Sequence, residues 1–247
     1  MPLRLPSRIS ACLLDLDGVL TQTAVLHAEA WKQAFDEFLA RRAARDGTAF
    51  VAFDALADYD EYVDGRPRED GTRTFLQARG IDLPEGRADD APGTETVHGI
   101  ANRKNDIVLA LMSERGVDVY PGSLRFVREA RRVGLATAVV SSSANTVAVL
   151  RAAGLEGLFD VRVDGVVAVE EHLRGKPAPD TFLAAATRLG RAPADCAVFE
   201  DALAGVAAGR AGGFGLVVGV DRVGAAAELT AHGADVVVAD LAELVEA

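Results

Sequence analysis

The sequence is short of cysteine, of long apolar runs and of basic residues, and each shortage narrows what the chain can be. Its two cysteines in 247 residues, Cys12 and Cys196, stand beside or within apolar, strand-like stretches. We expect both to be buried thiols, which fits a reducing compartment. No apolar run approaches the roughly 20 residues that span a bilayer, and Asp15 and Asp17 interrupt the N-terminal segment before a signal-peptide core can form. We therefore expect a cytoplasmic protein without a membrane partner.

Basic residues are too few for a surface that binds nucleic acid. The chain has 37 Asp and Glu against 26 Lys and Arg, a formal net charge of -11. Nucleic-acid binding needs a basic face that neutralises phosphates, so no nucleic-acid partner is expected. Any anionic substrate must then meet locally placed cations. The length suits one domain with an insertion or two small domains, and we expect a monomer or a small homo-oligomer.

Short β-branched apolar runs alternate with helical patterns, which is typical of βαβ units and a mostly parallel sheet. The runs are residues 9–14, 135–140, 161–163, 196–199, 216–220 and 236–238. Between Leu20 and about Tyr120, amphipathic helical spacings dominate instead. We predict an α/β protein: a Rossmann-like, doubly wound parallel sheet core from residues 1–20 and 118–247. An all-helical cap, residues 21–117, is inserted after the first strand.

Polar clusters follow three of these predicted strands, at Asp15 to Gly18, Ser141 to Ser143, and Glu200 with Asp201. Ligands of open α/β sheets bind beyond the carboxyl ends of the strands, so the clusters should converge on one site. Strand alternation would send the Asp15 and Asp17 carboxylates to the same side. Taken alone, this pair is equally typical of a polar strand end that leads into a turn.

The later motifs also have a structural and a functional interpretation. The hydroxyls of Ser141 to Ser143 suit phosphate oxygens, although a serine run commonly caps a helix. Lys176 stands between a glycine and a proline-containing loop, although a lone lysine is normally solvated. Glu200 and Asp201 are adjacent acids at a strand end, and such a donor set suits a hard cation.

In this order and spacing, the four motifs resemble those of the haloacid dehalogenase superfamily of phosphotransferases over essentially the whole chain. The resemblance implies that Asp15 is the nucleophile that forms an aspartyl-phosphate and that Asp17 is the general acid and base. It implies a Mg²⁺ cofactor held by Asp15, the Asp17 main-chain carbonyl and Asp201, with Glu200 acting through a water molecule. It assigns the oxygens of the transferred phosphoryl group to Ser141, Ser142 and Lys176. The second aspartate argues against dehalogenase chemistry.

The insertion resembles the helical cap of the β-phosphoglucomutase-like subfamily. That resemblance assigns substrate binding to six residues in the cap and the second-motif loop: His27, Arg68, Lys104, Asn105, Ser143 and Asn145. His27, near Lys104, would couple substrate binding to alignment of Asp17, although a half-buried polar group on its helix is the commoner arrangement. Arg68 would bind the phosphate that is not transferred, although it could instead pair with Glu69 or Asp70.

The chain also departs from the subfamily pattern. Ala144 stands where the mutase usually has a lysine, which puts one distal-phosphate cation in doubt. The cap has extra residues around 41–57 and 80–97, which could add a lid or an oligomer surface.

The resemblance implies interconversion of β-D-glucose 1-phosphate and glucose 6-phosphate through a bisphosphate intermediate. The alternative is a phosphatase for a small sugar phosphate, which shares the first half-reaction. A catalytically silent binding protein would be expected to lack one of the motif residues. Asp15, Asp17, Lys176 and Asp201 are all present.

Overall fold

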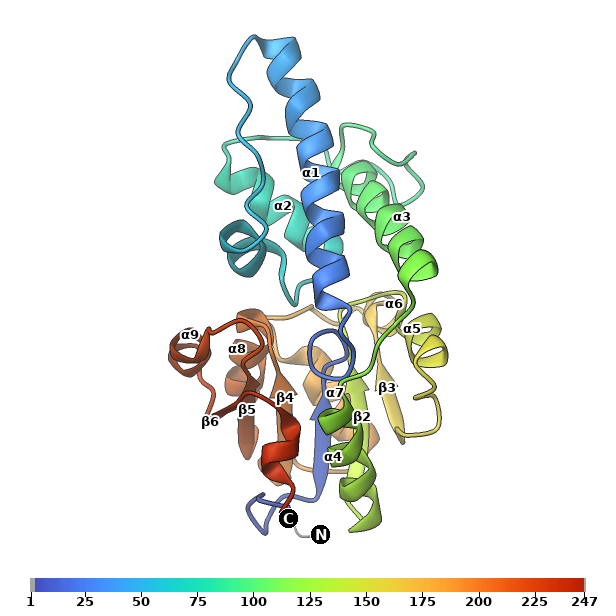
Figure 1. Ribbon diagram of the computed structural model, residues 1–247, viewed down its shortest axis with the longest axis vertical. Coiled ribbons are helices and arrows are strands. Elements are labelled where there is room, and N and C mark those ends of the chain that lie inside the picture. The colour runs from blue at the N-terminus through green and yellow to red at the C-terminus, as the bar shows by residue number, and fades with distance from the viewer. Residues whose placement is uncertain (1–2, 247) are drawn as a thin grey trace. The chain divides into compact units, whose positions relative to one another are not determined.

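The computed structural model describes residues 3–246 and divides the chain into two compact units (Figure 1). The first unit comprises Met1–Gln22 and Val117–Ala247, and the second comprises Thr23–Gly116. The chain therefore leaves the first unit after its first strand and returns to it 94 residues later, counted from 23 to 116.

The first unit contains a six-stranded parallel sheet with the order β3-β2-β1-β4-β5-β6. Its strands are β1 Ala11–Leu14, β2 Ala136–Val140, β3 Val161–Val163, β4 Cys196–Glu200, β5 Leu216–Val220 and β6 Val236–Val238. Each predicted apolar run forms one of these strands. The near-continuous burial of β1, β4 and β5 is expected for parallel strands that are covered on both faces.

Helices cover both faces of the sheet, which confirms the predicted doubly wound α/β class. They are α4 Pro121–Arg132, α5 Thr146–Ala152, α6 Gly165–Glu170, α7 Asp180–Arg188, α8 Leu203–Ala211 and α9 Ala226–Ala231, with 3₁₀ turns η2 Pro193–Asp195 and η3 Leu241–Leu244. On one face, Phe182 of α7 and Val206 of α8 share a buried cluster with Val198. On the other, the ring of Phe126 of α4 lies 4.9 Å from that of Phe199. Val198 and Phe199 point to opposite faces because strand side chains alternate.

The second unit is built from helices and loops: α1 Ala24–Asp46, the π-helical turn η1 Tyr59–Val63, α2 Arg68–Ala78 and α3 Val97–Arg115. Its core is aromatic. The Phe35 ring centroid lies 4.2 Å from that of Phe75 and 5.0 Å from that of Trp31. Trp31, Phe35 and Phe38 of α1 belong to this core, whereas Leu26, Ala30 and Ala34 pack in a second cluster with Ile107 and Val108 of α3.

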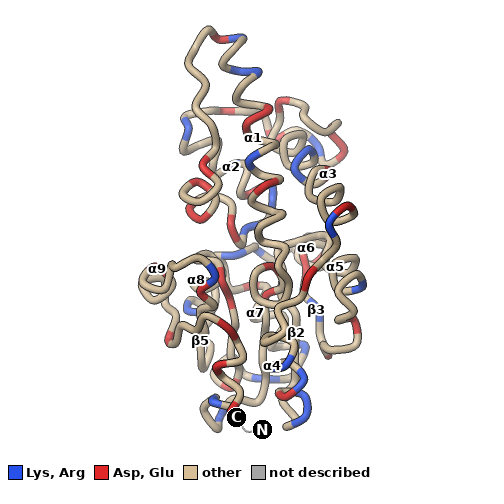
Figure 2. The backbone as a smooth tube through the Cα atoms, in the orientation of Figure 1, with Lys and Arg blue, Asp and Glu red and all other residues tan. Residues whose placement is uncertain are grey.

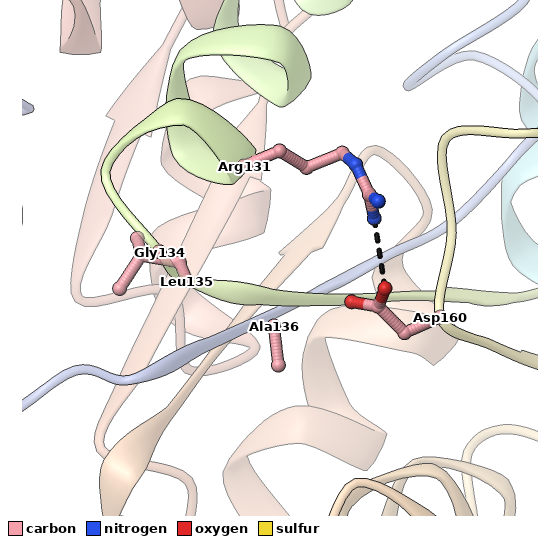
Figure 3. Close-up of a pocket in the computed structure, with 5 residues that line it drawn as sticks. All are labelled: Arg131, Gly134, Leu135, Ala136 and Asp160. Atoms are coloured by element: carbon pink, nitrogen blue, oxygen red, sulfur yellow. Dashed lines mark hydrogen bonds and ion pairs between the residues drawn. The ribbon is translucent and has the colours of Figure 1, made fainter.

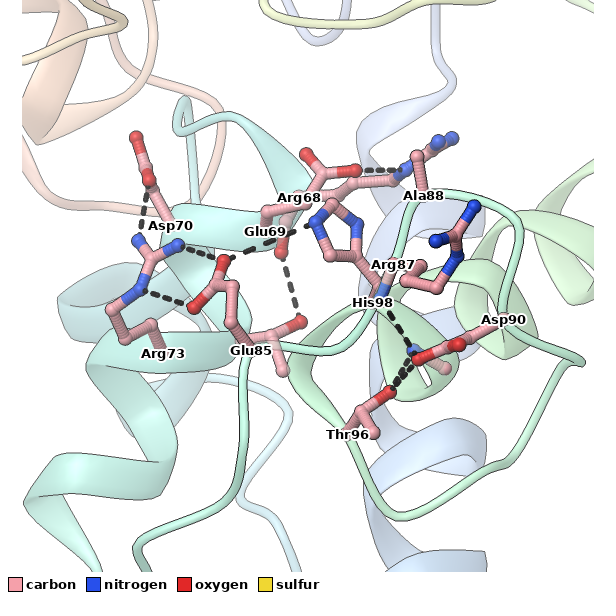
Figure 4. A network of polar contacts seen from close by, with 12 residues as sticks. Arg68, Glu69, Asp70, Arg73, Glu85, Arg87, Ala88, Asp90, Thr96 and His98 are labelled. Atoms are coloured by element: carbon pink, nitrogen blue, oxygen red, sulfur yellow. Dashed lines mark hydrogen bonds and ion pairs between the residues drawn. The ribbon is translucent and has the colours of Figure 1, made fainter.

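The two extra segments of the insertion pack against this second unit. Segment 41–57 contributes Phe53, which is 1% exposed and whose ring stacks 5.2 Å from that of Phe35. Segment 80–97 joins a polar network that Figure 4 shows around Arg73, Glu85 and Thr96. There Arg73 Nη2 donates to Glu85 Oε1 at 2.7 Å, and Thr96 Oγ1 donates to an Asp90 carboxylate oxygen at 2.6 Å. Both segments therefore complete the unit's core or its polar surface.

Cys12 and Cys196 are free and buried, as expected, and burial raises the pKa of the Cys196 thiol to about 11. Figure 2 shows acidic and basic residues interspersed along both units. Among the described residues, none of the helices combines the length and apolar character needed to cross a membrane.

Candidate active site

The candidate active site lies where the central strands of the first unit end. In the sheet register, Leu14 of β1 is level with Val139 of β2 and with Phe199 of β4. The N–H of Asp15 donates to the Phe199 carbonyl oxygen at 3.0 Å, so the first residue after β1 is held against β4. The polar residues that follow these strands therefore stand at one edge of the sheet, where ligands of such folds bind.

Lys176 joins two of the polar clusters. Its Nζ lies 2.5 Å from Asp15 Oδ1 and 2.5 Å from Glu200 Oε1, and it donates to the Val140 carbonyl oxygen at 3.0 Å. Asp15, Lys176 and Glu200 are 7%, 2% and 0% exposed. Buried charges are costly unless they are paired, and here the ammonium donates hydrogen bonds to Asp15 and Val140 and forms an ion pair with Glu200. The resemblance implied that Lys176 offsets the charge of the carboxylate cluster, and the structure identifies Asp15 and Glu200 as its ion-pair partners.

Burial and neighbouring charges both shift the pKa values of Asp15 and Lys176. Burial raises the pKa of the Asp15 carboxyl well above its ordinary value, and Glu200 and Asp17 add to the rise while Lys176 opposes it. Burial also disfavours the charged form of Lys176, but Asp15 and Glu200 outweigh burial and raise the pKa of its ammonium. Lys176 is therefore a fixed positive charge at neutral pH.

Two glycines make room for the acidic side chains. Gly18 has a φ of +86°, and a Cβ there would lie 1.6 Å from Asp201 Oδ2. A Cβ at Gly205, in the first turn of α8, would lie 1.9 Å from the carboxyl carbon of Glu200. Any larger residue would have to displace a carboxylate, so the glycine that follows the Asp15 and Asp17 pair permits a close backbone approach to Asp201.

Asp15, Glu200 and Asp201 form a candidate metal centre. Each offers a carboxylate oxygen, and these oxygens all lie within 4.8 Å of one another. Three carboxylates beside the single Lys176 ammonium leave a formal excess of two negative charges. Hard divalent cations prefer oxygen ligands of this kind, so the donor set fits a metal ion.

Asp17 lies in a tight turn between β1 and the insertion. The N–H of Gly18 donates to the Thr21 carbonyl oxygen at 2.7 Å, and Thr21 Oγ1 donates back to the Leu16 carbonyl oxygen at 3.1 Å. Thr21 is fully buried, whereas Asp17 is half-buried. The turn thus fixes the backbone on both sides of Asp17 and leaves its side chain partly accessible.

The second-motif loop after β2 is held by its own serine hydroxyls. Ser141 Oγ accepts from the Ser143 N–H at 3.1 Å, and Ser143 Oγ accepts from the Asn145 N–H at 3.1 Å. Ser141 is buried, and Ser142, Ser143 and Asn145 are half-buried. Accepting these bonds leaves each hydroxyl hydrogen able to donate, for example to a phosphate oxygen. The N-cap of α5 is Asn145, without a side-chain cap hydrogen bond, and phosphate binding by the serines stays a prediction.

His27 and Lys104 meet within the second unit. Lys104 Nζ lies 2.9 Å from His27 Nδ1 and 5.0 Å from the Trp31 ring centroid. Lys104 is 5% exposed, which is unusual for a lysine, whereas His27 is half-buried. His27 is thus a half-buried polar group on its helix, which is the commoner arrangement that the sequence left open.

The remaining cap residues are placed on two helices. Arg68 begins α2, and its Nε donates to Glu69 Oε1 at 2.8 Å, which is the local pairing left open from the sequence. Figure 4 shows this pair at the margin of the polar network. Asn105 is half-buried on α3, next to Lys104.

One open hollow of the first unit lies away from this chemistry. It has a volume of about 320 Å³ and is lined by Arg131, Gly134, Leu135, Ala136 and Asp160 (Figure 3). Ala136 is the first residue of β2, so the hollow is at the amino end of that strand. Asp15, Ser141 and Glu200 lie at the opposite, carboxyl ends of their strands, so this hollow does not belong to the candidate site.

Known proteins resemble this chain in sequence and in structure. A family model described as haloacid dehalogenase-like hydrolase matches residues 9–213. The β-phosphoglucomutase of Mycobacterium tuberculosis is 57% identical over 245 residues, which cover 98% of this chain and 94% of that protein. A fructose-1-phosphate phosphatase of Escherichia coli is 30% identical over 212 residues, covering 85% and 96%. The crystal structure of a β-phosphoglucomutase from Clostridium difficile matches with a TM-score of 0.73 and 25% identity, covering 96% and 93%.

Proposed function

The chain belongs to the haloacid dehalogenase-like hydrolase family, and we propose that it is a sugar-phosphate mutase of the β-phosphoglucomutase type. It would interconvert β-D-glucose 1-phosphate and glucose 6-phosphate through an aspartyl-phosphate and a bisphosphate. The observation that carries this proposal is the buried Asp15, with one carboxylate oxygen held 2.5 Å from Lys176 Nζ at the carboxyl edge of the sheet. The 57% identity to a whole mutase supports the choice of reaction.

In the first proposed step, an Asp15 carboxylate oxygen attacks the phosphorus of the sugar bisphosphate. The bond between phosphorus and the sugar oxygen breaks, and Asp17 donates a proton to that oxygen. Lys176 would stabilise the negative oxygens of the transferred group, and it opposes the rise in the pKa of Asp15 that burial causes. The Ser141 and Ser142 hydroxyls and the N–H groups of their loop would donate to the same oxygens.

In the second proposed step, a hydroxyl of the sugar monophosphate attacks the aspartyl-phosphate. Asp17, now a carboxylate, takes the proton of that hydroxyl, and the Asp15 carboxylate leaves. The two steps are chemically the reverse of each other, so one acid/base group serves both. A mutase also has to keep water from the aspartyl-phosphate, because water as acceptor gives hydrolysis.

We propose Mg²⁺ as the cation of the Asp15, Glu200 and Asp201 group, with the Asp17 main-chain carbonyl as a further ligand. When bound, the ion neutralises negative charge on the transferring phosphoryl group. Asp201 would be a direct ligand. Glu200 is fully buried and paired with Lys176, so we assign it a contact through water in addition to its role in holding that lysine.

The cap roles are also part of the proposal. Arg68 would bind the phosphate that is not transferred, together with Ser143 and Asn145 of the second-motif loop. Asn105 would donate to sugar hydroxyls, while the His27 and Lys104 pair would link substrate binding to the alignment of Asp17. A cytoplasmic location and a monomeric or small homo-oligomeric state belong to the same proposal, and cell fractionation and size-exclusion chromatography test them.

The second candidate is a phosphatase, which the fructose-1-phosphate phosphatase relative favours. One experiment separates the two. The protein is incubated with β-glucose 1-phosphate, Mg²⁺ and a trace of glucose 1,6-bisphosphate, and glucose 6-phosphate and free phosphate are followed together. A mutase gives glucose 6-phosphate with little free phosphate. Equal or greater release of free phosphate identifies the phosphatase, and Asp15→Asn is the blank for both products.

A further inference from the structure

Arg222, in the loop after β5, stands outside every motif but bonds several backbone carbonyls and stacks on an aromatic ring. Its guanidinium group is stacked 3.6 Å above the Tyr120 ring centroid, and its side chain is only 14% exposed. Its polar partners are the carbonyl oxygens of Gly18 at 2.9 Å, Val19 at 3.4 Å and Ala239 at 2.8 Å, with Ser123 Oγ at 3.4 Å and Asp240 Oδ2 at 3.2 Å. All of these residues belong to the first unit.

Two of these partners immediately follow the proposed acid/base residue. Gly18 and Val19 continue the chain directly after Asp17, and their carbonyl oxygens face the guanidinium group. The bond from Arg222 Nε to Gly18 is the shorter of the two. An arginine fork that binds neighbouring carbonyls fixes their relative orientation, which a single ammonium cannot do. Arg222 therefore restrains the backbone that carries Asp17.

Other partners lie on the segment by which the chain re-enters the first unit. Tyr120 is stacked against Arg222, and its N–H donates to the Leu20 carbonyl oxygen at 3.0 Å. One step further out, the Gln22 N–H donates to the Asp118 carbonyl oxygen at 2.9 Å. The outgoing and returning segments thus pair with each other. Arg222 contacts both segments: it bonds Gly18 and Val19 of the outgoing segment and stacks on Tyr120 of the returning segment.

The nucleophile is held by different contacts. Asp15 is fixed by its N–H bond to the Phe199 carbonyl oxygen and by the Lys176 ion pair. No contact of Arg222 described above reaches either of these groups. Removal of the guanidinium group should therefore loosen the Asp17 turn while Asp15 stays in place.

We propose that Arg222 is a positioning residue for the general acid and base: it holds the Gly18 and Val19 carbonyls so that the Asp17 carboxyl stays aligned with the reacting oxygen. This inference rests on the proposed function, in which Asp15 attacks phosphorus and Asp17 protonates the leaving oxygen. It has a distinctive consequence. A sugar oxygen needs that proton to leave, whereas a nitrophenolate leaves without one.

The test measures the first chemical step with two phosphoryl donors at saturating Mg²⁺. Rapid mixing follows the burst of p-nitrophenol from p-nitrophenyl phosphate and, separately, phosphoenzyme formation from glucose 1,6-bisphosphate. Arg222→Ala should slow phosphorylation by the sugar bisphosphate roughly 10- to 100-fold, a part of the 10²- to 10⁴-fold that general acid catalysis contributes. Phosphorylation by p-nitrophenyl phosphate should change less than about threefold, since its leaving group needs no acid. KM for the sugar bisphosphate should stay near its wild-type value.

Two further variants and an additive complete the design. Arg222→Lys retains the charge but not the planar fork, so it should recover only part of the loss. Guanidinium ion at millimolar concentration should partly restore Arg222→Ala. Arg151→Ala is the matched control, because Arg151 is an exposed arginine of the same unit that pairs with Glu156, and it should behave as wild type with both donors.

The outcomes separate this inference from the proposed function. If both donors slow equally in a folded Arg222→Ala protein, or if neither slows, Arg222 does not position Asp17. If Asp15→Asn still forms a phosphoenzyme, the proposed function itself is wrong. Should Arg222→Ala fail to fold by circular dichroism, Tyr120→Leu replaces it. That variant removes the stacked ring and keeps the hydrogen bonds, and it should show the same donor selectivity at smaller amplitude.

Discussion

Replacing Lys176 by methionine tests whether its positive charge, and not only its packing, stabilises the buried carboxylates of Asp15 and Glu200. Methionine keeps a flexible side chain of similar length and removes the ammonium group. The substitution leaves Asp15 and Glu200, which are 7% and 0% exposed, without the cation that lies 2.5 Å from each. We expect loss of turnover and a large loss of stability in the protein kept free of divalent metal.

The size of the loss can be bounded in two ways. Removing one partner of a buried pair typically costs about 3–5 kcal/mol, because the other charge stays buried and uncompensated. The folded variant can instead take up a proton. Protonating a carboxyl of ordinary pKa near 4 at pH 7 costs about 3 × 1.4, or roughly 4 kcal/mol, which sets a ceiling of the same size. For a chain of 247 residues this corresponds to a fall in Tm of roughly 8–16 °C.

The sign of the pH dependence follows from the proton uptake. A carboxyl whose folded pKa lies above its unfolded value binds a proton in the folded state that the unfolded chain lacks at neutral pH, so acid stabilises the folded variant. The difference in Tm between Lys176→Met and wild type should therefore shrink as the pH is lowered from about 7.5 to 5.5.

Scanning calorimetry on EDTA-treated protein measures these effects, with Arg151→Met as the matched control. Arg151 pairs with Glu156 on the exposed surface and should cost little. Added Mg²⁺ should raise the Tm of Lys176→Met more than that of wild type, because a cation at the three carboxylates replaces part of the missing charge. A loss below about 1 kcal/mol at pH 7.5, or equal Mg²⁺ effects on both proteins, would refute the charge-balance argument.

Three further predictions concern the metal, the cap and the acid stability of the fold. Asp201→Ala should raise the Mg²⁺ concentration needed for half-maximal activity more steeply than Glu200→Gln does, since a direct ligand matters more than one acting through water; equal titrations of both variants and wild type would remove Asp201 from the metal site. Arg68→Ala should weaken binding of the sugar bisphosphate by one to two powers of ten and leave acetyl phosphate hydrolysis nearly unchanged, while the exposed Arg87→Ala should alter neither. Burial opposes ionisation of Asp160, but hydrogen bonds from Thr137 and Arg131 outweigh burial and lower the pKa of this carboxyl below the ordinary 3.8. The ionised carboxylate therefore stabilises the folded protein, and this stabilisation is lost as the pH falls through the folded pKa. Asp160→Asn should accordingly flatten the fall of Tm between about pH 5 and 2.

The sheet could be predicted from the sequence because each strand is a short, β-branched, buried run. Parallel strands covered on both faces give continuous apolar stretches, and all six were recognisable by this pattern. The convergence of polar residues followed from chain geometry alone, since parallel strands end at one edge. Such patterns can be recognised in the sequence because they depend on neighbouring residues and not on distant partners.

Contacts between residues far apart in the chain had no comparable signal. The pairing of Lys176 with Glu200, and that of Arg222 with the Gly18 carbonyl 204 positions away, depends on how separate loops meet. Arg222 stands in no motif, and its importance is visible only through its partners. The extra segment 41–57 likewise gave only a length difference, whereas the structure shows that it buries Phe53 in the second unit.

Arg68 shows how far a contact in the free protein constrains a function. Its pairing with Glu69 at 2.8 Å is the alternative that the sequence left open, but the two side chains are 30% and 27% exposed. Such a pair contributes about 0–1 kcal/mol, whereas a charge-assisted bond from arginine to a phosphate contributes roughly 1.5–3 kcal/mol. On these magnitudes the proposed phosphate contact would outweigh the pair with Glu69, so the observed pair does not exclude it. If Arg68→Ala weakens the bisphosphate and the monophosphate equally, the pair with Glu69 is the role of Arg68. If only binding of the bisphosphate is weakened, Arg68 binds the second phosphate and pairs with Glu69 when no substrate is bound.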